Sequence, residues 1–314
     1  MIYLIVICDW QEIYDLTLSG KEEEMFAVLC TIFAILVVFC LWVILYDTHH
    51  FVTVKYHFSS HLIKKPTRFI MISDLHNYQY GRENSQLLAS IKKVEPDMIL
   101  IAGDVITADR HEKFDKTIDF LKQLKEQYPV YYAYGNHEQK INLYKSYKDM
   151  GEHFEKALAQ TGIKPLRNTH VSLADRGIAI YGLEIEHDYY KRFSVGSLPE
   201  NYLEKLLGSP KTDVYSILLA HNPEHFPDYA KWGADLVLSG HTHGGIIRVP
   251  FLGGFISPSL QLFPKYDGGL FSEGKTSMVL GRGLGTHTPK VRLFNPAELI
   301  IVELQPESTG EESK

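Results

Sequence analysis

The sequence has few cysteines and no excess of positive charge, and both shortages exclude classes of function. The three cysteines, Cys8, Cys30 and Cys40, all lie within the first 40 of 314 residues. The rest of the chain therefore has no disulfide, no thiolate metal site and no cysteine nucleophile. The formal net charge is −6, so no nucleic-acid partner is expected, because that binding needs a basic surface. Internal repeats and low-complexity linkers are also missing, which indicates one large domain.

Residues 25–46 form the one long apolar run without a charged side chain. About 20 apolar residues cross a bilayer as a helix, so we predict a transmembrane helix here. A buried core helix is disfavoured because no polar face interrupts the run. A cleavable signal peptide is disfavoured because only Lys21 closely precedes the run and no small-residue cleavage site follows it. Residues 1–24 are then an N-terminal tail, or translation starts at Met25, and the sequence leaves both open.

The predicted domain follows the membrane helix, at residues 48–304, and residues 305–314 are predicted to form a disordered polar tail. Three lysines, Lys55, Lys64 and Lys65, closely follow the helix, whereas only Lys21 precedes it. The positive-inside rule therefore predicts a single-pass protein of the cell membrane with its domain on the cytoplasmic side.

Apolar strands alternate with helical patterns along the domain, and hairpins follow. The predicted strands are residues 51–58, 68–73, 97–102, 130–134, 214–220, 234–239, 276–281 and 297–304, with a hairpin at 169–183. The predicted helices include residues 85–94, 113–127 and 147–160. Such an order predicts a layered α/β domain with mixed sheets.

Five of these strands end in oxygen or imidazole side chains. The residues are Asp74 and His76, Asp104, Asn136 and His137, His221, and His241 with His243. One such residue after a strand is usually a turn or cap, but five strand ends of this kind disfavour coincidence. Ligands of open α/β sheets bind at this edge, and the one-residue gaps let paired side chains point to the same side.

Seven oxygen and imidazole ligands exceed what one four- or five-coordinate ion takes, so they suit two ions that share a carboxylate. Two cations about 3.5–4 Å apart can clamp a phosphoryl group and activate a water molecule. Imidazole mixed with carboxylate and carboxamide favours Mn, Fe or Zn over Mg or Ca. The expected cofactor is therefore a pair of divalent ions.

The motifs "DLH", "GDV", "GNHE", "AHNP" and "GHTHGG", in this order, resemble those of the calcineurin-like metallophosphoesterases. The resemblance covers essentially the whole predicted domain. It implies a four-layered α/β/β/α sandwich, a dinuclear metal centre at the sheet edges and hydrolysis of phosphoester bonds.

The resemblance also implies a role for each ligand. The first ion would be held by Asp74, His76 and His243, the second by Asn136, His221 and His241, and Asp104 would bridge them. His137 would be the catalytic residue, as a general acid on the leaving oxygen or as a hydrogen-bond donor to the phosphate. Many family members carry an acid three residues after the bridging aspartate to orient that histidine, and here the position is Thr107.

The membrane helix, "GHTHGG" and a late "GRGLGT" resemble one branch of the family, the bacterial membrane-anchored phosphodiesterases of the YaeI and YkuE type. Ile246 stands where this branch usually has Gln. The branch includes enzymes proposed to cleave the pyrophosphate of UDP-2,3-diacylglucosamine. We therefore expect cleavage of a phosphodiester or pyrophosphate, on a lipid-linked substrate. The alternative is a general phosphodiesterase or phosphomonoesterase with a soluble or cell-wall substrate. A metal-free binding scaffold is disfavoured because all seven ligands are present.

Other residues give weaker signals. Arg282 is either a substrate-phosphate ligand or a surface arginine, and the two interpretations are equally supported. His287 is interpreted as a bystander, and His187, Tyr189 and Tyr190 receive no role. The apolar residues 246–264 are interpreted as ordinary core, with a wall for an acyl chain as the alternative.

Overall fold

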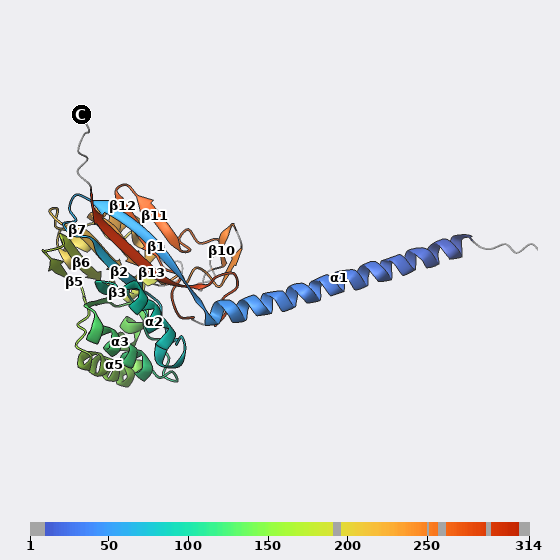
Figure 1. Cartoon of the computed structure of the whole chain (residues 1–314), viewed down its shortest axis with the longest axis horizontal. Coiled ribbons are helices and arrows are strands. Elements are labelled where there is room, and N and C mark those ends of the chain that lie inside the picture. The colour runs from blue at the N-terminus through green and yellow to red at the C-terminus, as the bar shows by residue number, and fades with distance from the viewer. Residues whose placement is uncertain (1–9, 191–195, 250, 257–261, 287–289, 308–314) are drawn as a thin grey trace, which may run out of the picture.

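The computed structural model describes residues 10–190, 196–249, 251–256, 262–286 and 290–307. His287 lies outside the described residues. The described part of the chain begins with one long helix, α1 (Trp10–His49), which projects from the rest of the molecule (Figure 1). This helix contains the predicted membrane segment 25–46, and the described part of the predicted tail, residues 10–24, is helical as well.

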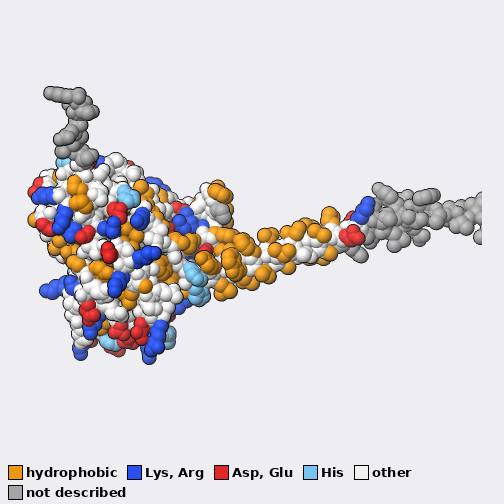
Figure 2. Space-filling model, in the orientation of Figure 1, with side chains coloured by type: hydrophobic (Ala, Val, Ile, Leu, Met, Phe, Trp, Pro, Cys, Tyr) orange, Lys and Arg blue, Asp and Glu red, His pale blue; other side chains and the backbone are white. Residues whose placement is uncertain are grey.

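Within α1, Glu24–His49 is long and apolar enough to cross a membrane, a test that a signal sequence near the N-terminus also passes. Only 6% of its most apolar window is buried inside the protein. Figure 2 shows hydrophobic side chains along the helix up to the domain. The domain itself therefore buries very little of this apolar surface.

The first sheet has the strand order β1-β13-β2-β3-β4. Its strands are β1 (Phe51–Ser60), β13 (Ala297–Pro306), β2 (Thr67–Ile72), β3 (Met98–Ala102) and β4 (Val130–Ala133). Strands β2, β3 and β4 are parallel, while β13 is antiparallel to β2 and parallel to β1. Strand β13 extends beyond the predicted end of the domain at residue 304.

The second sheet has the order β11-β12-β8-β7-β6-β5. Its strands are β11 (Gly269–Glu273), β12 (Thr276–Leu280), β8 (Leu236–Ser239), β7 (Tyr215–Ala220), β6 (Ile178–Leu183) and β5 (Thr169–Leu173). The four central strands are parallel, and β11 and β5 are antiparallel edge strands. A separate hairpin joins β9 (Ile247–Val249) to β10 (Gly253–Ile256).

Helices cover the outer faces of both sheets. On the first sheet lie α2 (Ser85–Val94), α3 (Asp115–Gln127) and α5 (Lys148–Gln160), and on the second lie α6 (Tyr202–Leu207) and α7 (Phe226–Trp232). The remaining helices are α4 (Asn136–Leu143) and the short 3₁₀ turns η1 (Arg82–Asn84), η2 (Lys145–Tyr147), η3 (His187–Tyr190) and η4 (Pro223–His225).

The alternation of side chains along the strands produces separate cores on the two faces of each sheet. In β3, Ile99 and Ile101 pack against the helices, whereas Leu100 and Ala102 pack between the sheets. The two sheets therefore share one apolar layer, and the predicted four-layered α/β/β/α sandwich is confirmed. The expectation that residues 246–264 form ordinary core is wrong for the described part of this range, because Phe251 is fully exposed and Leu252, Leu262 and Phe263 are exposed as well. Residues 250 and 257–261 lie outside the described residues.

Candidate metal centre

Six of the seven predicted ligands lie on loops that leave the strands, and neighbouring loops are hydrogen-bonded to one another. The Asp74 N–H donates to the Gly103 carbonyl at 3.0 Å, and the His76 N–H donates to the Asp104 carbonyl at 3.1 Å. In the other sheet, the Gly240 N–H donates to the His221 carbonyl at 3.1 Å. These bonds fix adjacent loops to each other, so the side chains that they carry have a defined spacing.

Three overlapping groups of side chains have ligand atoms within 4.8 Å of one another. They are Asp74, His76 and His243; His76, Asp104 and His137; and Asp104, His221 and His241. Because the groups share His76 and Asp104, they form one continuous cluster between the two sheets. Six of the seven predicted ligands, and His137 with them, are thus brought together.

The seventh predicted ligand, Asn136, is the first residue of α4. Its Oδ1 atom is buried and has no hydrogen-bond partner. A buried, unpaired amide oxygen costs about 1–3 kcal/mol, and a divalent ion is one group that would satisfy it. This orphaned oxygen therefore fits a metal ligand.

Most of the predicted ligands have a left-handed backbone conformation. Five of the seven, Asp74, His76, Asp104, His241 and His243, have φ angles between 46° and 75°. The left-handed region costs a non-glycine residue of order 1–3 kcal/mol, and such strain concentrates at functional sites. Here the left-handed residues follow the ends of β2, β3 and β8, where they end the extended course of the strand before each ligand loop.

His221 is oriented as a metal ligand. Its Nδ1 lies 2.7 Å from the Ala102 carbonyl, and since a carbonyl only accepts, Nδ1 carries a proton. The Nε2 atom lies 3.0 Å from Oδ2 of Asp104, yet it makes no hydrogen bond. A ring nitrogen and a carboxylate oxygen that lie this close without a hydrogen bond fit two ligands of one metal ion. Burial lowers the pKa of His221, but Asp104 and Asp74 outweigh it and raise the pKa to about 10.

Two buried carboxylates carry the charge of the cluster. Burial raises the pKa of Asp74 to about 6, although His221 opposes this shift. Burial also acts to raise the pKa of Asp104, but the neighbouring His221 holds it well below its usual value. Asp104 is therefore the ionised carboxylate at the centre of the cluster.

A backbone amide, rather than a side-chain acid, orients His137. The Ala108 N–H donates to His137 Nδ1 at 2.7 Å, so Nδ1 is unprotonated and the neutral ring carries its proton on Nε2. The hydroxyl of Thr107 lies 3.4 Å from His76 Nδ1 instead. The structure thus explains how His137 is held although Thr107 replaces the acid common in the family.

The sequence reasoning missed Glu138, which is fully buried beside the cluster. Its carboxylate accepts the N–H groups of Gly135, Asp104 and Val105 at 2.8–2.9 Å. A glutamate at this position of a helix is a capping-box residue, which was the available signal. Burial and the Asp104 charge raise the pKa of Glu138 to about 7.

Tyr190 was also missed. Its ring lies edge-on to His241, with centroids 5.3 Å apart, and 6.1 Å from His221. It belongs to η3, so the turn after β6 forms a wall of the metal centre. No ligand motif includes this turn, and only the folded chain brings it to the site.

Arg282 lies beside the metal-ligand loop and is paired within the protein. Its Nε is 2.9 Å from Oε1 of the buried Glu298, and its side chain packs against Gly244. The pairing gives Arg282 a structural contact, while its binding to a substrate phosphate stays a prediction.

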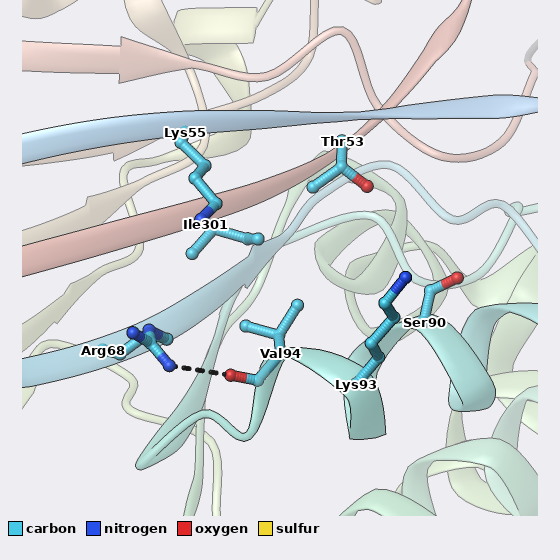
Figure 3. A pocket seen from close by; sticks show the side chains of 7 residues that line it. All are labelled: Thr53, Lys55, Arg68, Ser90, Lys93, Val94 and Ile301. Atoms are coloured by element: carbon cyan, nitrogen blue, oxygen red, sulfur yellow. Dashed lines mark hydrogen bonds between the residues drawn. The ribbon is translucent and has the colours of Figure 1, made fainter.

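A hollow of about 430 Å³ lies apart from the metal centre (Figure 3). Lys55, Arg68 and Lys93 line it, and Arg68 donates to the Val94 carbonyl at 3.0 Å. Arg68 stands near the start of β2, whereas Asp74 follows the end of that strand. The hollow and the metal centre are therefore at opposite ends of the sheet.

Comparison with known proteins agrees with this geometry. The family model for calcineurin-like phosphoesterase matches residues 67–245, more than half of the chain. This chain belongs to the calcineurin-like phosphoesterase family. It is thus a metallophosphoesterase, a hydrolase that acts on phosphoester bonds.

Three relatives illustrate the match. An uncharacterized metallophosphoesterase of Campylobacter jejuni is 30% identical over 248 residues, which are 77% of this chain but only 60% of the relative. Phosphodiesterase YaeI of Escherichia coli (strain K12) is 28% identical over 76% of this chain and 82% of its own length. The YkuE metallophosphoesterase of Bacillus subtilis (strain 168) is 28% identical over 76% of this chain and 79% of its own length. The predicted resemblance to this branch is confirmed.

We predict that Glu138→Gln weakens metal binding. The amide places a donor NH₂ among backbone N–H groups that need acceptors, so the Asp104 loop loses its support. Removing a hydrogen-bond partner that supports a metal ligand typically lowers metal affinity about 10–100-fold. Calorimetric titration of the full chain with Mn²⁺ measures this. Glu152→Gln, which alters a glutamate on the exposed face of α5, is the matched control, and equal affinities for both variants would refute the role of Glu138.

Proposed function

We propose that the chain hydrolyses a phosphodiester or pyrophosphate bond at a membrane surface with two divalent ions. The observation that carries the proposal is the continuous cluster of ligands, which has more ligand atoms than one ion takes and in which two of the three groups share the buried carboxylate of Asp104. Asp74, His76 and His243 would hold one ion, and Asn136, His221 and His241 the other, with Asp104 between them.

The ions, when bound, polarise a phosphoryl oxygen and activate water. The residues of the chain do the rest. His137 presents its Nε2 proton, since Nδ1 is occupied by the Ala108 amide, and donates a hydrogen bond to an oxygen of the substrate phosphate. Glu138 and Ala102 hold the ligands Asp104 and His221 in place. Burial of these groups keeps their electrostatic effect strong.

A lipid-linked substrate is supported by one relative and by the position of α1. The UDP-2,3-diacylglucosamine pyrophosphatase LpxG of Chlamydia muridarum is 27% identical over 290 residues, 75% of this chain and 82% of that protein. In this chain α1 ends at His49 and β1 begins at Phe51, so one residue separates the helix from the domain. A domain held this close to the bilayer meets lipid-borne substrates at high effective concentration. A general phosphodiesterase or phosphomonoesterase on a soluble or cell-wall substrate is the alternative.

Metal removal tests the dinuclear centre. We expect hydrolysis of a generic aryl phosphodiester to stop after EDTA treatment and to return on addition of Mn²⁺, with two ions bound per chain. Asp104→Asn should be the most damaging ligand change, because it removes the charge that both ions share. Metal analysis and initial rates measure this, and full activity of the EDTA-treated protein would contradict the proposal.

His137→Ala is the matched control for that experiment. It should keep both ions but lower kcat by roughly 10²–10⁴-fold, the usual contribution of a positioned proton donor. The comparison separates loss of chemistry from loss of metal.

A pair of substrates tests the lipid preference. The two carry the same phosphate linkage, one is acylated and the other is not, and both are offered to the full chain in vesicles. We expect a higher kcat/KM for the acylated substrate, because the anchored domain stays at the surface where that substrate is concentrated. Equal kcat/KM values would mean that α1 only locates the protein at the membrane, and they would favour the soluble-substrate alternative.

A reporter fusion tests the orientation. We propose that the domain lies in the cytoplasm, as the excess of lysines after the helix favours. A phosphatase that is active only outside the cytoplasm, fused after residue 314, should therefore be inactive in cells. An active fusion would reverse the orientation.

A further inference from the structure

Five large apolar side chains are exposed on and beside the β9–β10 hairpin, which follows the metal-ligand loop. They are Phe251, Leu252, Phe255, Leu262 and Phe263, with exposed fractions between 38% and 106%; we call them the apolar rim. The Phe255 and Phe263 rings meet edge-on, with centroids 5.2 Å apart. Single exposed apolar residues are ordinary, but grouped ones mark an interaction surface.

The apolar rim lies beside α1. Phe294 joins the two, because its ring is 6.2 Å from that of Phe39 in α1 and it lines one hollow together with Phe251 and Leu252. In Figure 1, β10 is on the same side of the domain as the end of α1, and Figure 2 shows hydrophobic side chains at both places. The rim thus continues the apolar surface of the helix.

The position of Phe39 along α1 indicates how near the bilayer comes to the apolar rim. Phe39 lies seven residues before Tyr46, the end of the apolar run, which is about 10 Å along a helix axis. A bilayer that contains the run therefore reaches the level at which Phe294 meets the helix. This step rests on the proposed membrane anchor.

The rim is also connected to the metal-ligand loop. At the base of the hairpin, the Ile246 N–H donates to the Ile256 carbonyl at 2.7 Å. The Asn295 amide donates to the carbonyls of His243 and Gly245, both at 2.7 Å. The Asn295 N–H in turn donates to the Asp47 carboxylate in the last turn of α1 at 2.8 Å. Helix end, hairpin and metal loop are therefore bonded into one unit.

We propose that the apolar rim inserts into the lipid interface as a second membrane contact and holds the edge of the metal centre against the bilayer. Phe and Leu on an otherwise polar surface are typical of segments that enter the headgroup and acyl boundary. The occupant is lipid rather than a second copy of the chain, because α1 itself brings the bilayer to this side of the domain.

Site-specific fluorescence tests the insertion. The full chain with Cys8, Cys30 and Cys40 changed to Ser receives a single cysteine, Phe251→Cys, is labelled with the environment-sensitive dye NBD and is reconstituted in phosphatidylcholine vesicles. We expect a blue-shifted emission that doxyl-labelled lipids quench. Leu143→Cys, at a side chain 64% exposed at the end of α4, is the matched control and should give unshifted, unquenched emission.

A label on the native Cys40, in a chain with only the other two cysteines changed, separates this inference from the anchor. Quenching at residue 40 without quenching at 251 overturns the rim contact and leaves the anchor intact. No quenching at either position overturns both. A blue shift at 251 that doxyl lipids do not quench indicates a protein partner, such as a second copy, and also contradicts the proposal.

The double variant Phe251→Asp with Leu252→Asp gives a functional readout. Both side chains are exposed, so the fold should persist and the rate on a soluble aryl phosphodiester should stay unchanged. The rate on an acylated substrate in vesicles should fall severalfold, while Leu143→Asp leaves it unaltered. Equal vesicle rates for the two variants would contradict a role of the rim at the lipid surface.

Discussion

The burial of an ionised carboxylate, Asp104, is the constraint on which the metal centre depends. A carboxylate removed from water costs several kcal/mol unless charges and donors compensate it. The backbone N–H of His137 donates to Oδ1 of Asp104 at 2.8 Å, and the ring of His221 lies against Oδ2. These partners come from different sheets, so the charge of one residue joins the two halves of the sandwich. Divalent ions at the same place would compensate the charge further, which links metal binding to the stability of the site.

The close approach of the loops also depends on residues that make no contact with metal. A Cβ atom at Gly135 would overlap the Asp104 carboxylate, and a Cβ atom at Gly240 would overlap that of Asp74. Arg292, which is fully buried, donates to the carbonyls of Asn295, Gly283 and Gly285 and so fixes the segment before β13. Asn295 then holds the metal-ligand loop. The ligands are thus positioned by a second layer of backbone contacts.

The sequence predicted a layered α/β domain and the candidate ligands because both follow from the order of strands, helices and strand ends, whereas the four-layered arrangement was implied by the family resemblance. Apolar strands buried on both faces read as continuous runs, as in β3 and β7, and polar ligands that follow such runs meet at the edge of a sheet. The path of the loops between them was not predictable. The left-handed backbone of Asp74, Asp104 and His241 contradicts local preference and exists only because the folded domain enforces it.

The residues missed by the sequence share a physical reason. Glu138 and Tyr190 act through contacts with segments distant along the chain. The capping-box position of Glu138 signals a helix cap, but no local pattern shows that this side chain also holds the Asp104 loop. The apolar residues after "GHTHGG" were misjudged as core because apolar composition alone does not distinguish a protein interior from an exposed apolar surface. Their exposure became visible only in the fold.

Anomalous diffraction at the manganese edge, from crystals of the full chain grown with Mn²⁺, tests the central claim most directly. Two peaks about 3.5–4 Å apart, with Asp104 between them and Asn136 and His221 at one of them, are the expected result. One peak, or peaks away from the five strand ends, would contradict a dinuclear centre built by the convergence of the two sheets.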